Sequence, residues 1–130
     1  MTFFSSTISD PEILAFVDAW AALLEAGDYQ AAYDATAHSA EIHWTPELIQ
    51  AVIEQYGAAT PGQRVTVTGA PTDIHQRKEV DRWSANPNGS VGEVWYDLNI
   101  NGIVSDLTAI FALTQEASGI RISLNDIHVM

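Results

Sequence analysis

The stretch that decides the fold is residues 93–113, Glu-Val-Trp-Tyr-Asp-Leu-Asn-Ile-Asn-Gly-Ile-Val-Ser-Asp-Leu-Thr-Ala-Ile-Phe-Ala-Leu. Two runs with alternating apolar side chains flank Asn101-Gly102, the preferred dipeptide of a two-residue type I′ turn. Such a turn fixes the register, so Ile100 should lie opposite Ile103 and each further pair one step outward. The expected pairs keep the apolar residues on one face: Val94 with Ala109, Tyr96 with Leu107, and Leu98 with Ser105.

On the second face of this hairpin, the same register places Asp97 opposite Asp106. Opposed carboxylates repel, so the pair implies solvent exposure, a shared proton, a bound cation, or Arg121 reaching over from the last strand. Two carboxylates in unlike environments can supply an acid and a base at one pH. The alternative is the solvent side of a sheet that is buried on one side only. Three apolar residues also make this face suitable for sheet-to-sheet dimerisation: Trp95, Val104 and Ile110.

The last predicted strand, residues 120–129, changes the phase of its apolar positions between Leu124 and Ile127. A phase change of one residue predicts a β-bulge near Asn125-Asp126. Asp126 and His128 share a face if the strand is regular there, and a carboxylate that orients an imidazole is a common general-base arrangement. The alternative is a hydrogen-bonded structural histidine at the end of the sheet.

The N-terminal half carries helix signals at defined positions. Ser9 and Glu12 form a capping box before an apolar stripe of helical spacing, and Gly27 can take the left-handed conformation that ends this helix. Asp28 is expected to cap a shorter second helix. Thr45, followed by proline, is expected to begin a third helix that stops at Gly57.

After residue 60 the apolar period changes from helical to alternating. Short strands are expected at residues 64–68 and, as a polar edge strand, at 74–83. We therefore predict one α+β domain over residues 1–130, with a helical half at about 9–57 and a sheet half at about 64–129. About three N-terminal helices should pack on a curved antiparallel sheet.

The charge is strongly acidic: 17 Asp and Glu against 5 Lys and Arg give a net charge of -12. Residues 1–63 contain no Lys or Arg, and all the bases follow. Such a charge repels nucleic acid and anionic membranes, and permits a basic partner. Acidity can also serve solubility alone. Because the sequence has no cysteine and no signal-like start, we expect a cytoplasmic protein. The acids of this stretch are Asp10, Glu12, Asp18, Glu25, Asp28, Asp34, Glu41, Glu47 and Glu54.

Four aromatic residues could bound a cavity for a small apolar ligand, although large side chains of this kind more often fill a core. The segment His38-Ser-Ala-Glu-Ile-His43 has three possible metal ligands, but its histidines lie five residues apart, which departs from zinc-binding helices. We therefore expect neither a metal nor a cofactor. The four aromatic residues are Trp20, Tyr33, Tyr96 and Phe111.

Three N-terminal helices with a Gly27-Asp28-Tyr29 corner, followed by a long antiparallel sheet, resemble the nuclear-transport-factor-like superfamily, the cone-shaped cystatin-like α+β fold. In addition, Ser105-Asp-Leu-Thr108 together with Leu124–Met130 resembles the end of a family of small uncharacterised bacterial domains. Members of the superfamily include isomerases, dehydratases, ligand binders and dimeric adaptors, with a pocket between helices and sheet. A shared fold of this kind does not choose among these functions.

From these observations we expect a homodimeric, non-catalytic binding domain, such as an immunity or adaptor protein that recognises a basic partner. The alternative is a cofactor-independent isomerase or lyase that works in a pocket between helices and sheet. A third hypothesis is a passive binder of a small apolar ligand among the four aromatic residues. The acid and base residues of the alternative would be Asp97, Asp106, Asp126 and His128.

Overall fold

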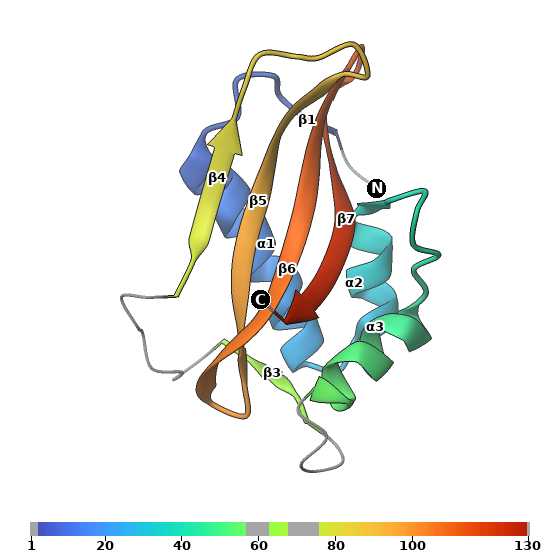
Figure 1. Ribbon diagram of the computed structural model, residues 1–130, viewed down its shortest axis with the longest axis vertical. Helices are drawn as coiled ribbons and strands as arrows, with labels where there is room; N and C mark the ends of the chain where they lie inside the picture. The colour runs from blue at the N-terminus through green and yellow to red at the C-terminus, as the bar shows by residue number, and fades with distance from the viewer. Residues whose placement is uncertain (1–2, 57–62, 68–75, 130) are drawn as a thin grey trace.

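The computed structural model of the chain describes residues 3–56, 63–67 and 76–129. It has an α+β fold in which three helices lie on one side of a curved sheet and leave the other side uncovered (Figure 1). The sheet is antiparallel except where β2 pairs with β7. In chain order the elements are β1 (Phe3–Phe4), α1 (Asp10–Glu25), α2 (Tyr29–Ala35), β2 (Ala37–His38), α3 (Pro46–Glu54), β3 (Val65–Thr66), β4 (Lys78–Arg82), β5 (Ser90–Ile100), β6 (Ile103–Glu116) and β7 (Gly119–Val129).

The helices begin at the residues that the sequence predicts. The Ser9 side chain accepts the backbone N–H of Glu12, and the Glu12 carboxylate accepts the N–H of Ser9, so the capping box before α1 is confirmed. Gly27 has a φ of 75°, the left-handed conformation expected after α1. Asp28 caps α2 and Thr45 caps α3, each through a side-chain oxygen. The expected stop of α3 at Gly57 lies outside the described residues, and α3 ends at Glu54.

The turn between β5 and β6 is confirmed. Asn101 and Gly102 have φ values of 53° and 78°, and positive φ at both central positions defines a type I′ turn. Ile100 pairs with Ile103, and Asn99 pairs with Val104.

Further from the turn the expected register is wrong. After Asn99 the next pair is Asp97 with Thr108, so β6 contributes more residues than β5 and forms a bulge around Ser105. The Ser105 hydroxyl donates to the Leu98 carbonyl at 2.5 Å, and its oxygen accepts the N–H of Leu107 at 3.2 Å. A serine side chain thus takes the place of a ladder hydrogen bond.

The bulge predicted in the last strand is confirmed. Ile110 pairs with Asp126 and the next residue, Phe111, pairs with Leu124, which leaves Asn125 as the extra residue. The bulge restores the apolar face of β7, because Ile127 is buried on the same side as Leu124.

The core lies between the helices and the covered side of the sheet. Trp20 of α1 packs edge-to-face on Phe111 of β6, with ring centroids 5.0 Å apart. β4 lies within the predicted edge strand, of which Ile74 and His75 are outside the described residues. Among the described residues no helix is long and apolar enough to cross a membrane. The largest buried side chains are Trp20, Tyr96, Phe111, Ile13, Leu24, Ile49, Ile53, Leu98, Leu113, Ile122, Leu124 and Val17.

Candidate functional site

The uncovered side of the sheet brings three of the four candidate acid and base residues together. Asp97 of β5 pairs with Thr108 of β6, and Thr108 pairs with His128 of β7. Asp126 lies one pair away, opposite Ile110. Because residues two apart on a strand share a face, these residues form two adjacent rows on the side away from the helices.

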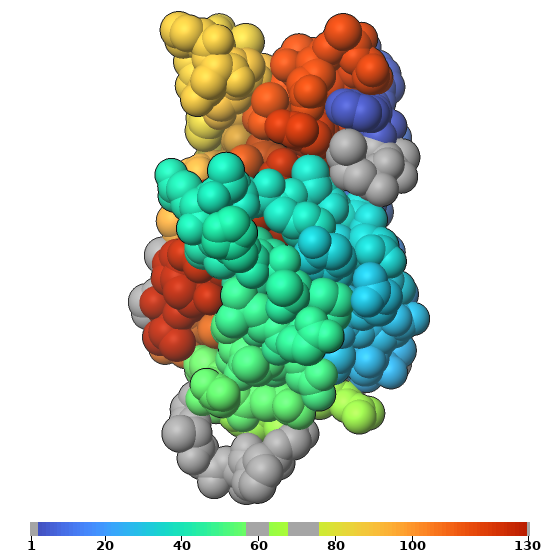
Figure 2. All heavy atoms as spheres, turned by 90° about the vertical axis from the view of Figure 1, so that its right-hand side faces the viewer, coloured from blue at the N-terminus to red at the C-terminus, as the bar shows by residue number. Residues whose placement is uncertain are grey.

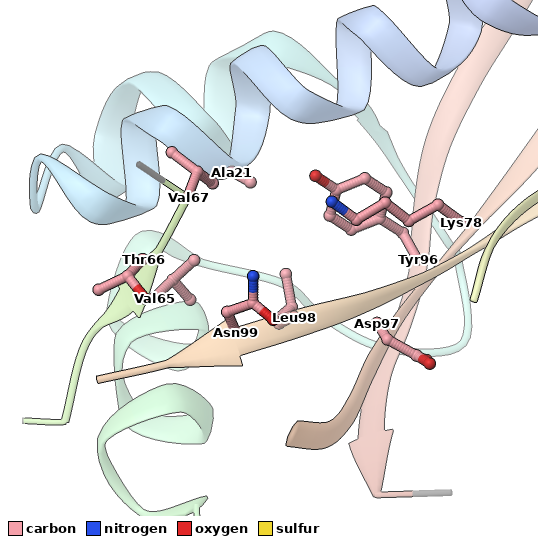
Figure 3. A pocket seen from close by; sticks show the side chains of 9 residues that line it. All are labelled: Ala21, Val65, Thr66, Val67, Lys78, Tyr96, Asp97, Leu98 and Asn99. Carbon is pink, nitrogen blue, oxygen red and sulfur yellow. The ribbon is translucent and has the colours of Figure 1, made fainter. Parts of the chain in front are cut away.

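Asp97 is a structural carboxylate. Its side chain is only 9% exposed and accepts the Thr108 hydroxyl and the backbone N–H of Arg77, each at 2.7 Å. Figure 3 shows it on the side of β5 opposite to Tyr96, which points toward α1. These two bonds satisfy the buried carboxylate and connect it to β6 and to the residue that precedes β4.

Asp126 and His128 share a face, as predicted for a regular strand end. The Asp126 carboxylate lies 2.6 Å from Nδ1 of His128, and both side chains are more than a third exposed. This contact fixes the ring orientation and leaves Nε2 as the nitrogen that could exchange a proton with a bound molecule.

Asp106 does not lie opposite Asp97, and this expectation is wrong. The bulge around Ser105 shifts β6, and Thr108 takes the place opposite Asp97. The Asp106 carboxylate instead accepts a hydrogen bond from the Tyr56 hydroxyl at the end of α3. This bond raises the pKa of the Tyr56 phenol above its ordinary value of 10.0. The expected repulsion between Asp97 and Asp106 is therefore absent. Each carboxylate instead accepts a hydrogen bond from a hydroxyl group, Asp97 from Thr108 and Asp106 from Tyr56.

Two of the three apolar residues predicted on the uncovered face, Trp95 and Ile110, are shielded from solvent at least in part, whereas Val104 is half-buried. The Arg77 guanidinium lies over the Trp95 ring, 4.7 Å from the centroid, and the indole N–H donates to Glu93 at 2.8 Å. Ile110, which pairs with Trp95, is buried although no helix covers this side. Less apolar surface is left for sheet-to-sheet contact than the sequence suggested.

The four aromatic candidates do not bound one cavity in the described part of the chain. Trp20, Tyr96 and Phe111 are core residues with at most 2% exposure, whereas Tyr33 stacks on His38 with centroids 4.1 Å apart. The hollow beside Tyr96, between α1, β3, β4 and β5, has a volume of about 10 Å³ (Figure 3). That volume suits about one water molecule.

Tyr96 connects the sheet to α1 through a polar contact in the core layer. Its hydroxyl donates to the Asp18 carboxylate, and the Lys78 ammonium lies 4.9 Å from its ring centroid. Burial, followed by the bond to Asp18, raises the pKa of the Tyr96 phenol well above its ordinary value of 10.0. Asp18 is one of the acids of residues 1–63, and its bond to Tyr96 gives it a structural role.

A larger hollow lies between the end of α3 and the β5–β6 hairpin. Its volume is about 220 Å³, and its walls include Tyr56 and three apolar hairpin residues, Ile100, Ile103 and Val104. None of the sequence candidates lines it, although Asp106 bonds to Tyr56 at its wall. Sequence patterns do not reveal such a site, because its two sides are 50 positions apart.

The helical face, defined as α2, residues 36–45 and α3, forms one continuous surface (Figure 2). Lys and Arg are absent from the sequence that builds it. Among the described residues, no three His, Asp or Glu side chains are placed to hold a metal ion. The exposed acids of the helical layer beyond α1 are Asp28, Asp34, Glu41 and Glu47.

The comparisons with known proteins give one match. The sequence pattern of a family described as Domain of unknown function (DUF7668) matches residues 21–130. The search of curated proteins and the search of solved structures gave no match. The matched span begins within α1 and includes α2, α3 and all of the sheet except β1. The chain therefore belongs to the DUF7668 family of domains of unknown function.

Proposed function

We propose that this protein is a non-catalytic binding domain, of the immunity or adaptor type, that docks a basic protein partner on its helical face. The observation that carries the proposal is the charge of this face, which has exposed carboxylates and neither Lys nor Arg. Complementary charge speeds association and selects among partners. The order of the elements, three helices and then a curved sheet, supports a distant relation to the nuclear-transport-factor-like superfamily, in which adaptors occur.

The helical face also offers apolar anchors beside its acids. Tyr29, Leu48 and Val52 pack against the core and remain partly exposed. Interfaces of moderate affinity combine such half-buried side chains with a polar rim. A basic partner could therefore bury these residues while its Lys and Arg side chains face the surrounding carboxylates.

The structure separates the acids that maintain the fold from those that face solvent. Asp18 holds Tyr96, and Asp28 accepts the backbone N–H of Ala31 as the cap of α2. Asp34 accepts only an exposed hydrogen bond from Gln30, four residues earlier on the same helix. Glu41 is exposed in the segment between α2 and α3. Asp34 and Glu41 can therefore be reversed in charge with little effect on the fold.

The test compares two double variants that change the net charge equally. Asp34→Lys with Glu41→Lys alters the helical face, and Glu79→Lys with Asp81→Lys alters exposed positions of β4. The partner is captured by cross-linking in native cells, purified, and measured by binding kinetics across a salt series. We expect the first variant to slow association about tenfold and to flatten its salt dependence. Equal rates for both variants, or a captured partner without excess basic charge, would refute the proposal.

A second candidate, a cofactor-independent isomerase or lyase, is favoured by the contact between Asp126 and His128. An oriented imidazole is a suitable general base, and here it would act on the uncovered face rather than between the two layers. The measurement is exchange of solvent deuterium into a panel of small ketones and acids, followed by NMR. Exchange by the native protein that His128→Gln abolishes would support this candidate, and absence of exchange would remove it.

A further inference from the structure

The hollow between Tyr56 and the β5–β6 hairpin differs from the space beside Tyr96 in size and exposure. Its volume of about 220 Å³ is close to the lower end of small-molecule sites, which begin at about 300 Å³. It opens beside Ile103, whose 67% exposure is the largest among the big apolar side chains of the described residues. A single exposed isoleucine is ordinary on a protein surface, and it is the hollow beside Ile103 that distinguishes this position.

The walls of the hollow have two chemically different parts. Ile100, Ile103 and Val104 form an apolar wall. The polar wall residues are Tyr56, Gln63, Asn101 and Ser105. The exposed Asp106 carboxylate is not part of the wall, but it accepts a hydrogen bond from the hydroxyl of a wall residue, Tyr56. A carboxylate has about four acceptor positions, and the Tyr56 hydroxyl uses one of them.

We propose that this hollow receives the side chain of a lysine or arginine of the basic partner. The proposal rests on the proposed function and deepens it by assigning an anchor point. Lysine and arginine have an apolar stem and a charged head, and this matches the two parts of the wall. The stem packs on Ile103 and Val104, and the head meets Asp106 beside the Tyr56 ring, where carboxylate and aromatic face both favour a cation.

The surrounding charges agree with a cationic occupant. The chain carries a net charge of -12, so an anionic ligand would be repelled. Arg64 lies next to the hollow, because it follows the wall residue Gln63 and its backbone bonds to the wall residue Asn101. Arg64 is not itself a wall residue, and its charge acts on the Tyr29 phenol. A neutral apolar ligand would contact the same apolar wall but would gain no attraction from Asp106. The experiment therefore compares the binding of a cationic and a neutral probe.

The first measurement is an NMR titration of the isotope-labelled full chain with three probes: N-butylguanidinium, pentanamide and pentanoate. We expect N-butylguanidinium to bind in the millimolar range and to shift the backbone amides of residues 103–106. Pentanamide should bind about tenfold more weakly, and pentanoate should not bind. Equal binding of the cation and the neutral amide would overturn the proposal, as would shifts located elsewhere.

Two variants and a matched control localise the effect. Asp106→Asn removes the charge but keeps the shape, and should weaken guanidinium binding about tenfold. Ile103→Ser removes the apolar wall at an exposed position, so it should leave stability unchanged and weaken the binding of cation and amide alike. Asp81→Asn, an exposed carboxylate on β4, should change neither. Unchanged guanidinium binding in both hollow variants would refute the proposal.

Failure of this inference can be told apart from failure of the proposed function. With the purified partner, Asp106→Asn should raise the dissociation rate about tenfold, whereas reversal of Asp34 and Glu41 should mainly slow association. If only the helical-face reversals act, the partner binds without the hollow and this inference is wrong. If Asp106→Asn acts and the helical-face reversals do not, the hollow is an anchor and the proposed docking face is wrong.

Discussion

Replacement of Thr108 by valine should destabilise the protein through the carboxylate beside it. Thr108 is fully buried, and its hydroxyl donates to Asp97, which is only 9% exposed, at 2.7 Å. Valine has nearly the same shape, so the change creates no cavity and removes one hydrogen bond to a charged acceptor. Such bonds contribute about 1.5–3 kcal/mol, and Asp97 keeps only the backbone N–H of Arg77. We expect the free energy of unfolding to fall by about 2 kcal/mol.

Urea unfolding followed by circular dichroism measures this loss. With a slope of about 1–3 kcal/mol per molar urea, the midpoint should fall by about 1 M while the slope stays constant. Thr108→Ser keeps the hydroxyl and loses one methyl group, so it should cost about 1 kcal/mol. Combining Thr108→Val with Asp97→Asn should give less than the sum of the single effects, because the two residues are in contact. A valine variant as stable as the native protein, or a serine variant equally impaired, would refute the reasoning.

Three further predictions concern packing, pH and salt. Gly92→Ala should destabilise the protein strongly and release β4, because the new Cβ would lie 2.3 Å from the Asp81 carbonyl oxygen; loss of amide hydrogen-exchange protection in β4 is the measurement. The stability supplied by the raised pKa of Tyr96 is fully present below pH 10.0 and is lost as the pH rises above it, because the unfolded phenol ionises first. Tyr96→Phe should flatten this alkaline decline in urea titrations, and parallel profiles would contradict the assignment. Arg82→Gln, which breaks the exposed ion pair with Asp10, should cost about 0.5–1 kcal/mol at low salt and less at high salt in thermal melts; a cost that does not depend on salt would exclude the ion pair as its source.

The β5–β6 hairpin shows how far sequence patterns reach and where they stop. Its turn follows from Asn101-Gly102, yet the register beyond the bulge differs from the expected one. The bulge shifts the pairing by an even number of residues, so every apolar side chain stays on its face. Alternation therefore could not reveal the shift, whereas in β7 the shift of one residue changed the phase and revealed the bulge at Asn125.

Among the candidate site residues, too, some contacts follow from the sequence pattern and others do not. The shared face of Asp126 and His128 follows from strand geometry alone, and the structure has them in contact. The partners of Asp97 and Asp106 depend on the bulge and on where α3 ends, so they could not be predicted. The two-residue strands β1 and β2 are not predicted by the sequence, because unlike β3 they do not belong to a run of alternating side chains.

By itself, the sequence determined the helix starts at Ser9, Asp28 and Thr45, the type I′ turn, the acidic helical layer and the α+β class. These features are local, since each depends on contacts within a few residues or on composition. Only the tertiary structure decided which carboxylates are buried, which bond to hydroxyl groups, and where a hollow forms beside the helical face. Those outcomes depend on contacts between residues far apart in the chain, whose geometry follows from how the helices and the bulged strands pack together.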